Sequence, residues 1–256
     1  MPGWTQFGIL ADMEIVDLDE RPDLCAAAID LGYTGGEFLR QGIGTSVANP
    51  HRYLRHWPTY FLIAVADGVP VARALAVPIA FPAAGRAALP NDGLDEAIQW
   101  AVQDVMDDRA PTALCALEVF VAPHRRRRGL AAAMVRAVNA RAAEAGLRKV
   151  VVPVRPVGKE AEPAVPMAEY AARRRPDGLP ADPWLRTHER LGAALVGICP
   201  SAVTVTGSIA EWLDWTGVKL EDGENLVPGG IAPVYASVTH DQGSYCEANV
   251  WMEHTI

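Results

Sequence analysis

The segment of this chain best suited to chemistry is residues 117–131, LEVFVAPHRRRRGLA. The pattern predicts a strand that ends near Pro123, an arginine-rich loop, and a helix that opens at Gly129. Free N–H groups of such a loop and the positive end of the helix dipole both attract an anion. Gly129 has no Cβ, so the backbone can close on that anion. We therefore predict a diphosphate-binding site here.

The four consecutive arginines, Arg125 to Arg128, need this context to be read as ligands. Alone, such a run is more typical of a solvated surface, whereas the strand–loop–glycine–helix order favours phosphate contact. A nucleotide-binding P-loop does not fit, because the loop has no lysine and no Gly-x-x-x-x-Gly-Lys-Ser/Thr motif. A second basic run, Arg173 to Arg175, precedes Pro176 and is interpreted as complementing a helix C-terminus.

The elements that must position this segment follow from hydrophobic periodicity. Residues 60–66 and 70–79 are predicted to form a hairpin around Asp67-Gly68, a dipeptide suited to a tight turn. The alternation of strands and helices predicts an α/β fold around a mixed sheet. Further strands are predicted at 13–18, 113–121, 150–154, 194–199, 203–206, 231–238 and 245–252, and helices at 20–31, 47–57, 94–106, 130–145, 167–174, 183–191 and 210–216.

Composition excludes several classes of protein. Half of the 256 residues are apolar and the net charge is -8, which is typical of a globular protein and argues against general nucleic-acid binding. The four cysteines form no CxxC pair and the six histidines show no metal-ligand spacing, so we expect reduced thiols and no metal. No signal peptide or membrane span is expected, which favours the cytoplasm. The abundance of Ala, Arg and Pro is typical of a bacterial source of high GC content.

Two motifs carry a resemblance to the GNAT superfamily of acyl-CoA-dependent N-acyltransferases. Residues 126–131, RRRGLA, are similar to that family's Gln/Arg-x-x-Gly-x-Gly/Ala loop, and residues 187–193, THERLGA, resemble its Tyr-Glu-x-Leu-Gly-Phe motif at the end of the fourth helix. The hairpin at 60–79 also resembles the family's second and third strands. The resemblance implies a mixed, mostly antiparallel central sheet flanked by helices. It covers a core of residues 1–200 with insertions at about 82–112 and 155–182, and leaves 201–256 as a C-terminal extension packed on the core.

The resemblance also implies the co-substrate, acetyl-CoA or another acyl-CoA, with no metal. The pantetheine arm lies in the gap where the family's fourth strand splays from the fifth. A bulge near Val119 would aim one N–H at the thioester carbonyl and stabilise oxyanion charge. The implied cofactor-binding residues are Val119 and Val121 through their backbone, and Arg126, Arg127, Arg128, Gly129, Leu130 and Ala131 in the loop.

The catalytic candidates are His188 and Glu118. The family places a tyrosine acid where this chain has His188, and a histidine can serve as acid or base or can simply pack or cap the helix. Glu118 is the only carboxylate on the motif strand and is a candidate base. Strand alternation puts it with Ala116 and Phe120, on the face opposite Val119, although a bulge could turn it toward the cleft.

The sequence gives weaker signals for the residues that would bind the acceptor substrate. Tyr33, Glu37 and Tyr60 are candidates by position. Cys115 as an acyl-carrying nucleophile is less favoured than inert packing. Four tryptophans in or beside the additions could wall an acceptor pocket or belong to the core: Trp184, Trp212, Trp215 and Trp251.

The function that these residues favour is transfer of an acetyl or other acyl group from coenzyme A to the amine of a small molecule, by direct attack in a ternary complex. One alternative takes the acyl group from the phosphopantetheine of an acyl carrier protein, which the arginines would then face. A second alternative is a catalytically silent protein that only binds the cofactor. The expected partner is the small-molecule amine, with no nucleic acid and no membrane, and the chain is expected to be a monomer or homodimer.

Overall fold

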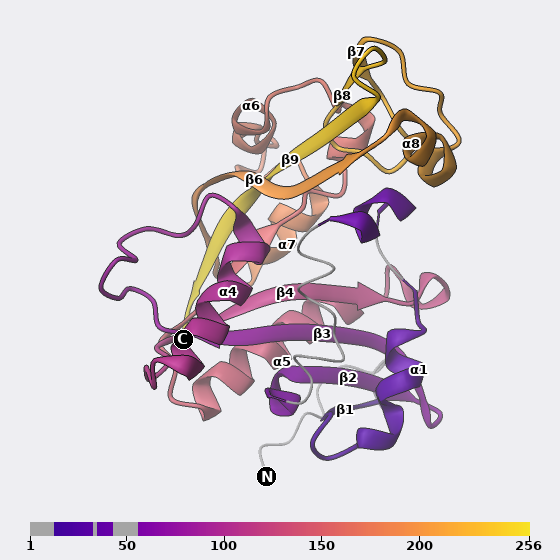
Figure 1. Cartoon of the computed structure of the whole chain (residues 1–256). Coiled ribbons are helices and arrows are strands. Elements are labelled where there is room, and N and C mark those ends of the chain that lie inside the picture. The colour runs from indigo at the N-terminus through magenta and orange to yellow at the C-terminus, as the bar shows by residue number, and fades with distance from the viewer. Residues whose placement is uncertain (1–12, 33–34, 43–55) are drawn as a thin grey trace.

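The computed structural model describes residues 13–32, 35–42 and 56–256, and a mixed sheet of nine strands forms the centre of that part (Figure 1). The strands are β1 (Met13–Asp17), β2 (Phe61–Ala66), β3 (Val69–Ile79), β4 (Ala113–Val121), β5 (Lys149–Val154), β6 (Ala194–Gly207), β7 (Gly223–Asn225), β8 (Val234–Ser237) and β9 (Gln242–Thr255). Their order across the sheet is β1-β2-β3-β4-β5-β9-β8-β7, with β6 also paired to β9. Every pair is antiparallel except β4 with β5. The predicted fold class is confirmed.

Helices cover both faces of this sheet. They are α1 (Cys25–Ile29), α4 (Gly93–Met106), α5 (Leu130–Glu144), α6 (Met167–Ala172), α7 (Pro183–Arg190) and α8 (Ile209–Thr216). The apolar side of α5, with Met134 and Val138, packs on Ala74 and neighbouring strand residues of one face. On the opposite face Ala28 of α1 and Ala97 of α4 pack on separate clusters of strand side chains. No helix in the described ranges is both long and apolar enough to span a bilayer.

The predicted hairpin of β2 and β3 is present. Asp67 and Gly68 have φ of 53° and 77°, so both central residues of the turn are left-handed. That is the geometry of a type I′ turn, whose twist matches the strands it joins. Local sequence therefore suffices to place these two strands.

The first helix is shorter than predicted. A 3₁₀ turn at Pro22–Leu24 precedes α1, which ends at Ile29 instead of residue 31. The guanidinium of Arg73 on β3 donates to the carbonyls of Ala28 and Ile29 at 2.8 and 3.2 Å, so these acceptors are taken from the helix. Tertiary hydrogen bonds thus replace the expected last turn. The helix predicted at 47–57 falls almost entirely outside the described residues.

The sheet runs across the expected boundary at residue 200. The two strands predicted at 194–199 and 203–206 form one strand, β6, whose register shifts between Cys199 and Val203. Strand β9 lies between β5 and β6, because Trp251 pairs with Pro153 on one side and with Gly197 on the other. Residues 242–255 therefore belong to the central sheet, while the proposed division into core and extension stays a prediction.

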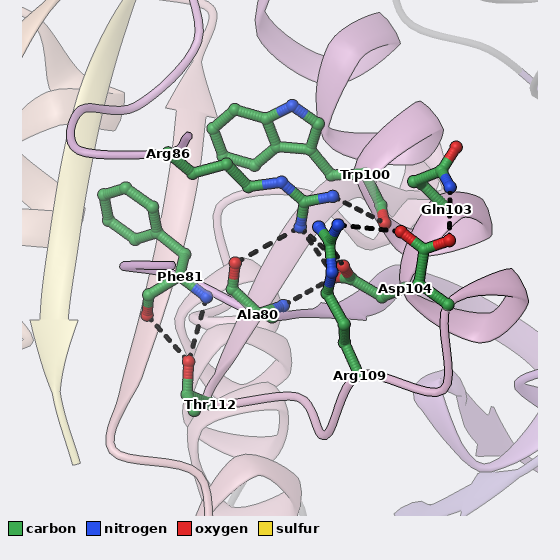
Figure 2. Close-up of polar contacts among 9 residues, drawn as sticks. Ala80, Phe81, Arg86, Trp100, Gln103, Asp104, Arg109 and Thr112 are labelled. Atoms are coloured by element: carbon green, nitrogen blue, oxygen red, sulfur yellow. Dashed lines mark hydrogen bonds and ion pairs between the residues drawn. The ribbon is translucent and has the colours of Figure 1, made fainter. Parts of the chain in front are cut away.

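A buried ion pair fastens the loop after β3 to helix α4 (Figure 2). Arg86 Nη1 lies 2.7 and 2.8 Å from the two carboxylate oxygens of Asp104, and Asp104 also accepts from the N–H of Ala80 at 2.7 Å. The guanidinium stacks over Trp100, 4.7 Å from the ring centroid. The stretch at 82–112 is thus tied to the sheet by its own charged pair.

We expect Asp104→Ala to destabilise the protein by about 3–5 kcal/mol, because Arg86 would keep its buried charge without a counter-ion. Urea unfolding at pH 7 measures this. Gln103→Ala on the same helix is the control, since it removes only an exposed hydrogen bond to Asp107 and should cost under about 0.5 kcal/mol. Equal stability losses in the two variants would contradict the role given to the pair.

Candidate active site

Strands β4 and β5 part soon after they begin. They pair only at Leu114 with Val150 and at Cys115 with Val151. In Figure 1 strands β1–β4 cross the lower half of the molecule, while β6 and β9 rise away from them. A cavity of about 640 Å³ occupies the gap, and its lining includes Val119 of β4 and Val152 of β5. The predicted splay is therefore present and leaves room for a ligand.

The loop between β4 and α5 has the properties of an anion site. Arg127 and Gly129 have φ of 63° and 78°, so the chain turns sharply before the helix. The N–H groups of residues 127–132 have no acceptor in the described part of the chain, and no side chain caps α5. A Cβ on Gly129 would meet no atom within 4 Å, so positive φ and not packing selects glycine here. These amides and the α5 dipole point to an anionic group.

The arginines of this loop differ in position. Arg125, Arg126 and Arg127 are among the residues that line the cavity, whereas Arg128 is exposed and is not among them. Arg126 donates from Nε to the carbonyl of Val121 at 3.2 Å. Arg125 lies 3.6 Å from Asp67 on the surface. The lining thus contains three of the arginines, together with Gly129, Leu130 and Ala131.

The backbone of β4 presents hydrogen-bonding groups to the gap. The N–H of Ala122 donates to Val71 on the β3 side at 2.9 Å. Because successive N–H groups of a strand point to opposite neighbours, those of Val119 and Val121 point away from β3. β5 does not pair with them. Both residues therefore offer free backbone groups where the resemblance places the pantetheine arm.

A β-bulge lies at Leu117, two residues before the predicted place at Val119. Leu75 pairs with Glu118 but Ala76 pairs with Ala116, which leaves Leu117 as the extra residue. The predicted alternation is consequently wrong in one respect. Ala116 packs with Val121 in the α5 cluster, whereas Glu118 keeps its predicted place on the face opposite Val119.

Glu118 meets Arg73 on that face. Arg73 Nη2 lies 2.6 Å from Glu118 Oε1 and 2.8 Å from the carbonyl of Gly32. The glutamate side chain is 27% exposed and lines the cavity. Burial raises its pKa, and the charge of Arg73 only partly opposes this. Glu118 is therefore a carboxylate at the cavity wall with raised proton affinity.

His188 is buried at the opposite wall, on α7. Its Nδ1 lies 3.0 Å from Nε2 of His254 on β9, and Trp184 packs edge-on at 4.5 Å between ring centroids. Burial and, second, His254 lower the pKa of His188 to about 3. The ring is thus neutral at physiological pH. Burial also lowers the pKa of His254, which the backbone carbonyl of Leu191 opposes.

Three buried polar side-chain atoms in the described residues have no hydrogen-bond partner. They are Asn139 Oδ1, His188 Nε2 and Asn249 Oδ1. All three residues line the same cavity. Because a buried polar atom without a partner costs free energy, their convergence indicates a polar ligand.

A further charged cluster lies where β5 ends. Glu247 of β9 is fully buried, and Arg155 Nε lies 3.0 and 3.1 Å from its carboxylate oxygens. The Tyr245 hydroxyl donates to Glu247 at 2.6 Å. Arg155, Glu247 and Asn249 line the cavity and were missed from the sequence. Their period-two spacing on the predicted strand 245–252 was the signal that places Glu247 and Asn249 on one face.

The remaining candidates lie as follows. Glu37 is exposed and pairs with Arg40, and neither it nor Tyr60 is among the lining residues. Tyr33 lies outside the described residues. Cys115 is buried in the α4 cluster and burial raises the pKa of its thiol, which favours the inert reading. Of the four tryptophans only Trp184 lines the cavity.

The Acetyltransferase (GNAT) family matches residues 37–169. The arginine N-acetyltransferase avaD of Aspergillus versicolor is 33% identical over 189 residues, which are 66% of this chain and 65% of that protein. The chain thus matches somewhat less than two thirds of the relative's length.

Two solved structures share this fold along almost the whole chain. The loading GNATL domain of CurA from Lyngbya majuscula superposes with a TM-score of 0.57 at 18% identity, over 95% of this chain and 97% of that one. The GphF GNAT-like decarboxylase in complex with isobutyryl-CoA gives 0.54 at 19% identity, over 95% and 98%. At these identities the likeness concerns the fold.

Proposed function

The chain belongs to the GNAT acetyltransferase family, and from that premise we propose that it transfers an acetyl group from acetyl-CoA to the amine of a small molecule. The expectation of a GNAT-type N-acyltransferase is confirmed at the level of the family. The observation that carries the proposal is the row of unpartnered amides at residues 127–132, which opens onto the cavity between β4 and β5.

Coenzyme A fits the residues present. The amides of residues 127–132, with Arg126 and Arg127, would hold its diphosphate. The free backbone groups of Val119 and Val121 would bond its amide-bearing arm. When bound, the acyl thioester supplies the activated acyl group. Asn139 and His188, each with one buried atom that has no partner, are among the residues that line the same cavity and are placed to orient it.

Direct attack by the acceptor is favoured over an acyl-enzyme. The described residues that line the cavity include no cysteine or serine, and the Thr187 hydroxyl donates to the Pro183 carbonyl at 2.9 Å. Glu118, with its raised pKa, is placed to take the proton that an ammonium group must lose before it attacks. Nearby backbone N–H groups of β4 can stabilise developing oxyanion charge.

An amino acid acceptor is supported by two observations. The relative avaD is named an arginine N-acetyltransferase. The residues that line the cavity carry charges of both signs. Glu118 and Glu247 are acidic, and Arg155 is basic. A zwitterionic substrate matches such a wall better than a purely cationic or apolar one. We therefore propose L-arginine, acetylated on its α-amine, as the first acceptor to test.

With acetyl-CoA we expect L-arginine to release thiol at least about tenfold faster than agmatine, which lacks the carboxylate and so one charged contact. Nα-acetylarginine is the matched control and should give no release, because its α-amine is blocked. Product mass identifies the acetylated nitrogen. Absence of thiol release with every amine of a broad panel would contradict the proposed function and favour the silent binding protein.

A further inference from the structure

The side chains of Asn139, His254 and His188 form a hydrogen-bonded chain that reaches the cavity. Asn139 Nδ2 on α5 lies 3.2 Å from His254 Nδ1, and His254 Nε2 lies 3.0 Å from His188 Nδ1. Both histidines are 1% exposed. Water therefore does not compete for these two bonds, and three separate elements, α5, β9 and α7, fix their geometry.

The direction of these bonds follows from the chemistry of the amide. An amide nitrogen donates and has no lone pair to accept with, so Asn139 donates to His254 Nδ1. His254 then carries its hydrogen on Nε2 and donates it to His188 Nδ1, with the backbone carbonyl of Leu191 as a second acceptor beside the ring. His188 in turn carries its hydrogen on Nε2, the ring atom that has no partner among the described residues. Since Nδ1 and Nε2 lie on opposite edges of the ring, this N–H turns away from His254.

We propose that Asn139 and His254 are positioning residues that hold His188 as a fixed hydrogen-bond donor, through Nε2–H, to the reacting thioester in the cavity. This role rests on the proposed acyl transfer. His188 gives up no proton in it. As the amine nitrogen bonds to the acyl carbon, the C–S bond breaks, and the leaving thiolate takes its proton from the attacking nitrogen or from water. The donor polarises the acyl thioester and stabilises negative charge as that charge builds, in the way that a neutral imidazole acts as an electrophile elsewhere.

The surroundings of His188 keep the ring uncharged. The groups that face it are His254 from β9 and Trp184 from its own helix, with Asn139 of α5 behind His254. Among described residues no carboxylate pairs with either histidine. A proton-donating acid would need the imidazolium form, which this environment disfavours. If His188 is a fixed hydrogen-bond donor, its nitrogen resonances and the pH profile of the activity should differ from those of a histidine that donates its proton as an acid.

The spectrum is the first test. In protein labelled with ¹⁵N-histidine, nitrogen shifts distinguish a protonated from an unprotonated ring nitrogen, and His188→Gln assigns the resonances. We expect His188 to be protonated on Nε2 alone from pH 5 to 9. We also expect acetyl-CoA to shift the Nε2 resonance. A hydrogen on Nδ1, or titration near pH 6.5, would overturn the proposal.

Two variants of His254 supply the second test. His254→Gln can still donate to His188 Nδ1, so kcat should stay within about threefold of the wild type. His254→Glu accepts from Nδ1, which inverts the tautomer and gives His188 a counter-charge. We expect that variant to lose about tenfold or more in kcat with KM for acetyl-CoA little changed, and to gain a new ionisation in its pH profile. Thermal unfolding checks that both variants fold.

The outcomes separate the two proposals. If the tautomer inverts in His254→Glu and kcat is unchanged, the donor role is overturned while acyl transfer stands. If the wild type releases no thiol from acetyl-CoA with any amine, the proposed function fails. In that case the His188 Nε2 resonance alone tests the hydrogen bond from His188 to the thioester. If acetyl-CoA does not shift this resonance, the hydrogen bond is overturned.

Discussion

Replacing Gly129 with glutamate is expected to weaken coenzyme A binding by at least about a hundredfold, measured by calorimetry. The new carboxylate would stand among the amides that the diphosphate needs, so like charges would repel each other at short range. The space in front of the residue is open, because an added Cβ meets no atom within 4 Å. The fold should therefore tolerate the change apart from the strain of a positive φ.

Gly146→Glu is the matched control for this variant. Gly146 follows the other end of α5, has φ of +71°, and also has open space where a Cβ would stand. It thus carries the same backbone strain and the same added charge away from the loop. We expect coenzyme A affinity close to that of the wild type. Equal losses in both variants, or none in Gly129→Glu, would contradict the loop assignment.

The same calorimetric titration of the wild type bears on the identity of the acyl donor. If free coenzyme A does not bind at millimolar concentration, the carrier-protein alternative gains support, because the adenosine 3′-phosphate is absent there and the basic loop would face an acidic partner.

Replacing Glu118 with glutamine is expected to lower kcat/KM by about a hundredfold at neutral pH. The glutamine keeps the shape of the side chain and can still accept from Arg73, so the contact with β3 persists. It cannot take a proton. The acceptor amine would then react only in the small fraction that is already neutral in solution.

The pH profile separates this role from a structural one. Burial raises the pKa of Glu118, so wild-type kcat/KM should rise with pH through that raised value, as the carboxylate forms. In Glu118→Gln this rise should be absent, and activity should climb only through the pKa of the amine. The deficit should therefore shrink at high pH, where no base is needed. A deficit that is constant with pH would sink the catalytic role.

Local sequence predicted the parts of the site that depend on neighbouring residues. The Asp67-Gly68 turn, β4, the loop and α5 are each encoded within a few residues, through turn chemistry, alternation and helical spacing. Gly129 was found because a glycine between the end of a strand and the start of a helix is typical of an anion site. His188 was found through the motif at 187–193.

The remainder depended on contacts between distant segments. Alternation along β4 assumes an unbroken pleat, and the bulge at Leu117 puts Ala116 on the face opposite Glu118. The early end of α1 is imposed by Arg73 of β3, because its guanidinium takes the carbonyl of Ala28. His254 meets Asn139 only because β9 pairs beside β5, and the register of that pairing is set by packing of the whole sheet.

The placement of β9 also bears on how the molecule assembles. Residues 149–154 pair with residues 250–255, so the chain between them, residues 155–249, must close into a loop when that edge of β5 is covered. Pairings of such large sequence separation raise the contact order of the fold and slow its folding. Closing a long loop costs conformational entropy before the contacts that it permits have formed. Until β9 docks, β5 exposes an unpaired edge of valines. The element that completes the cavity is therefore also the one whose late arrival leaves the nascent protein open to aggregation.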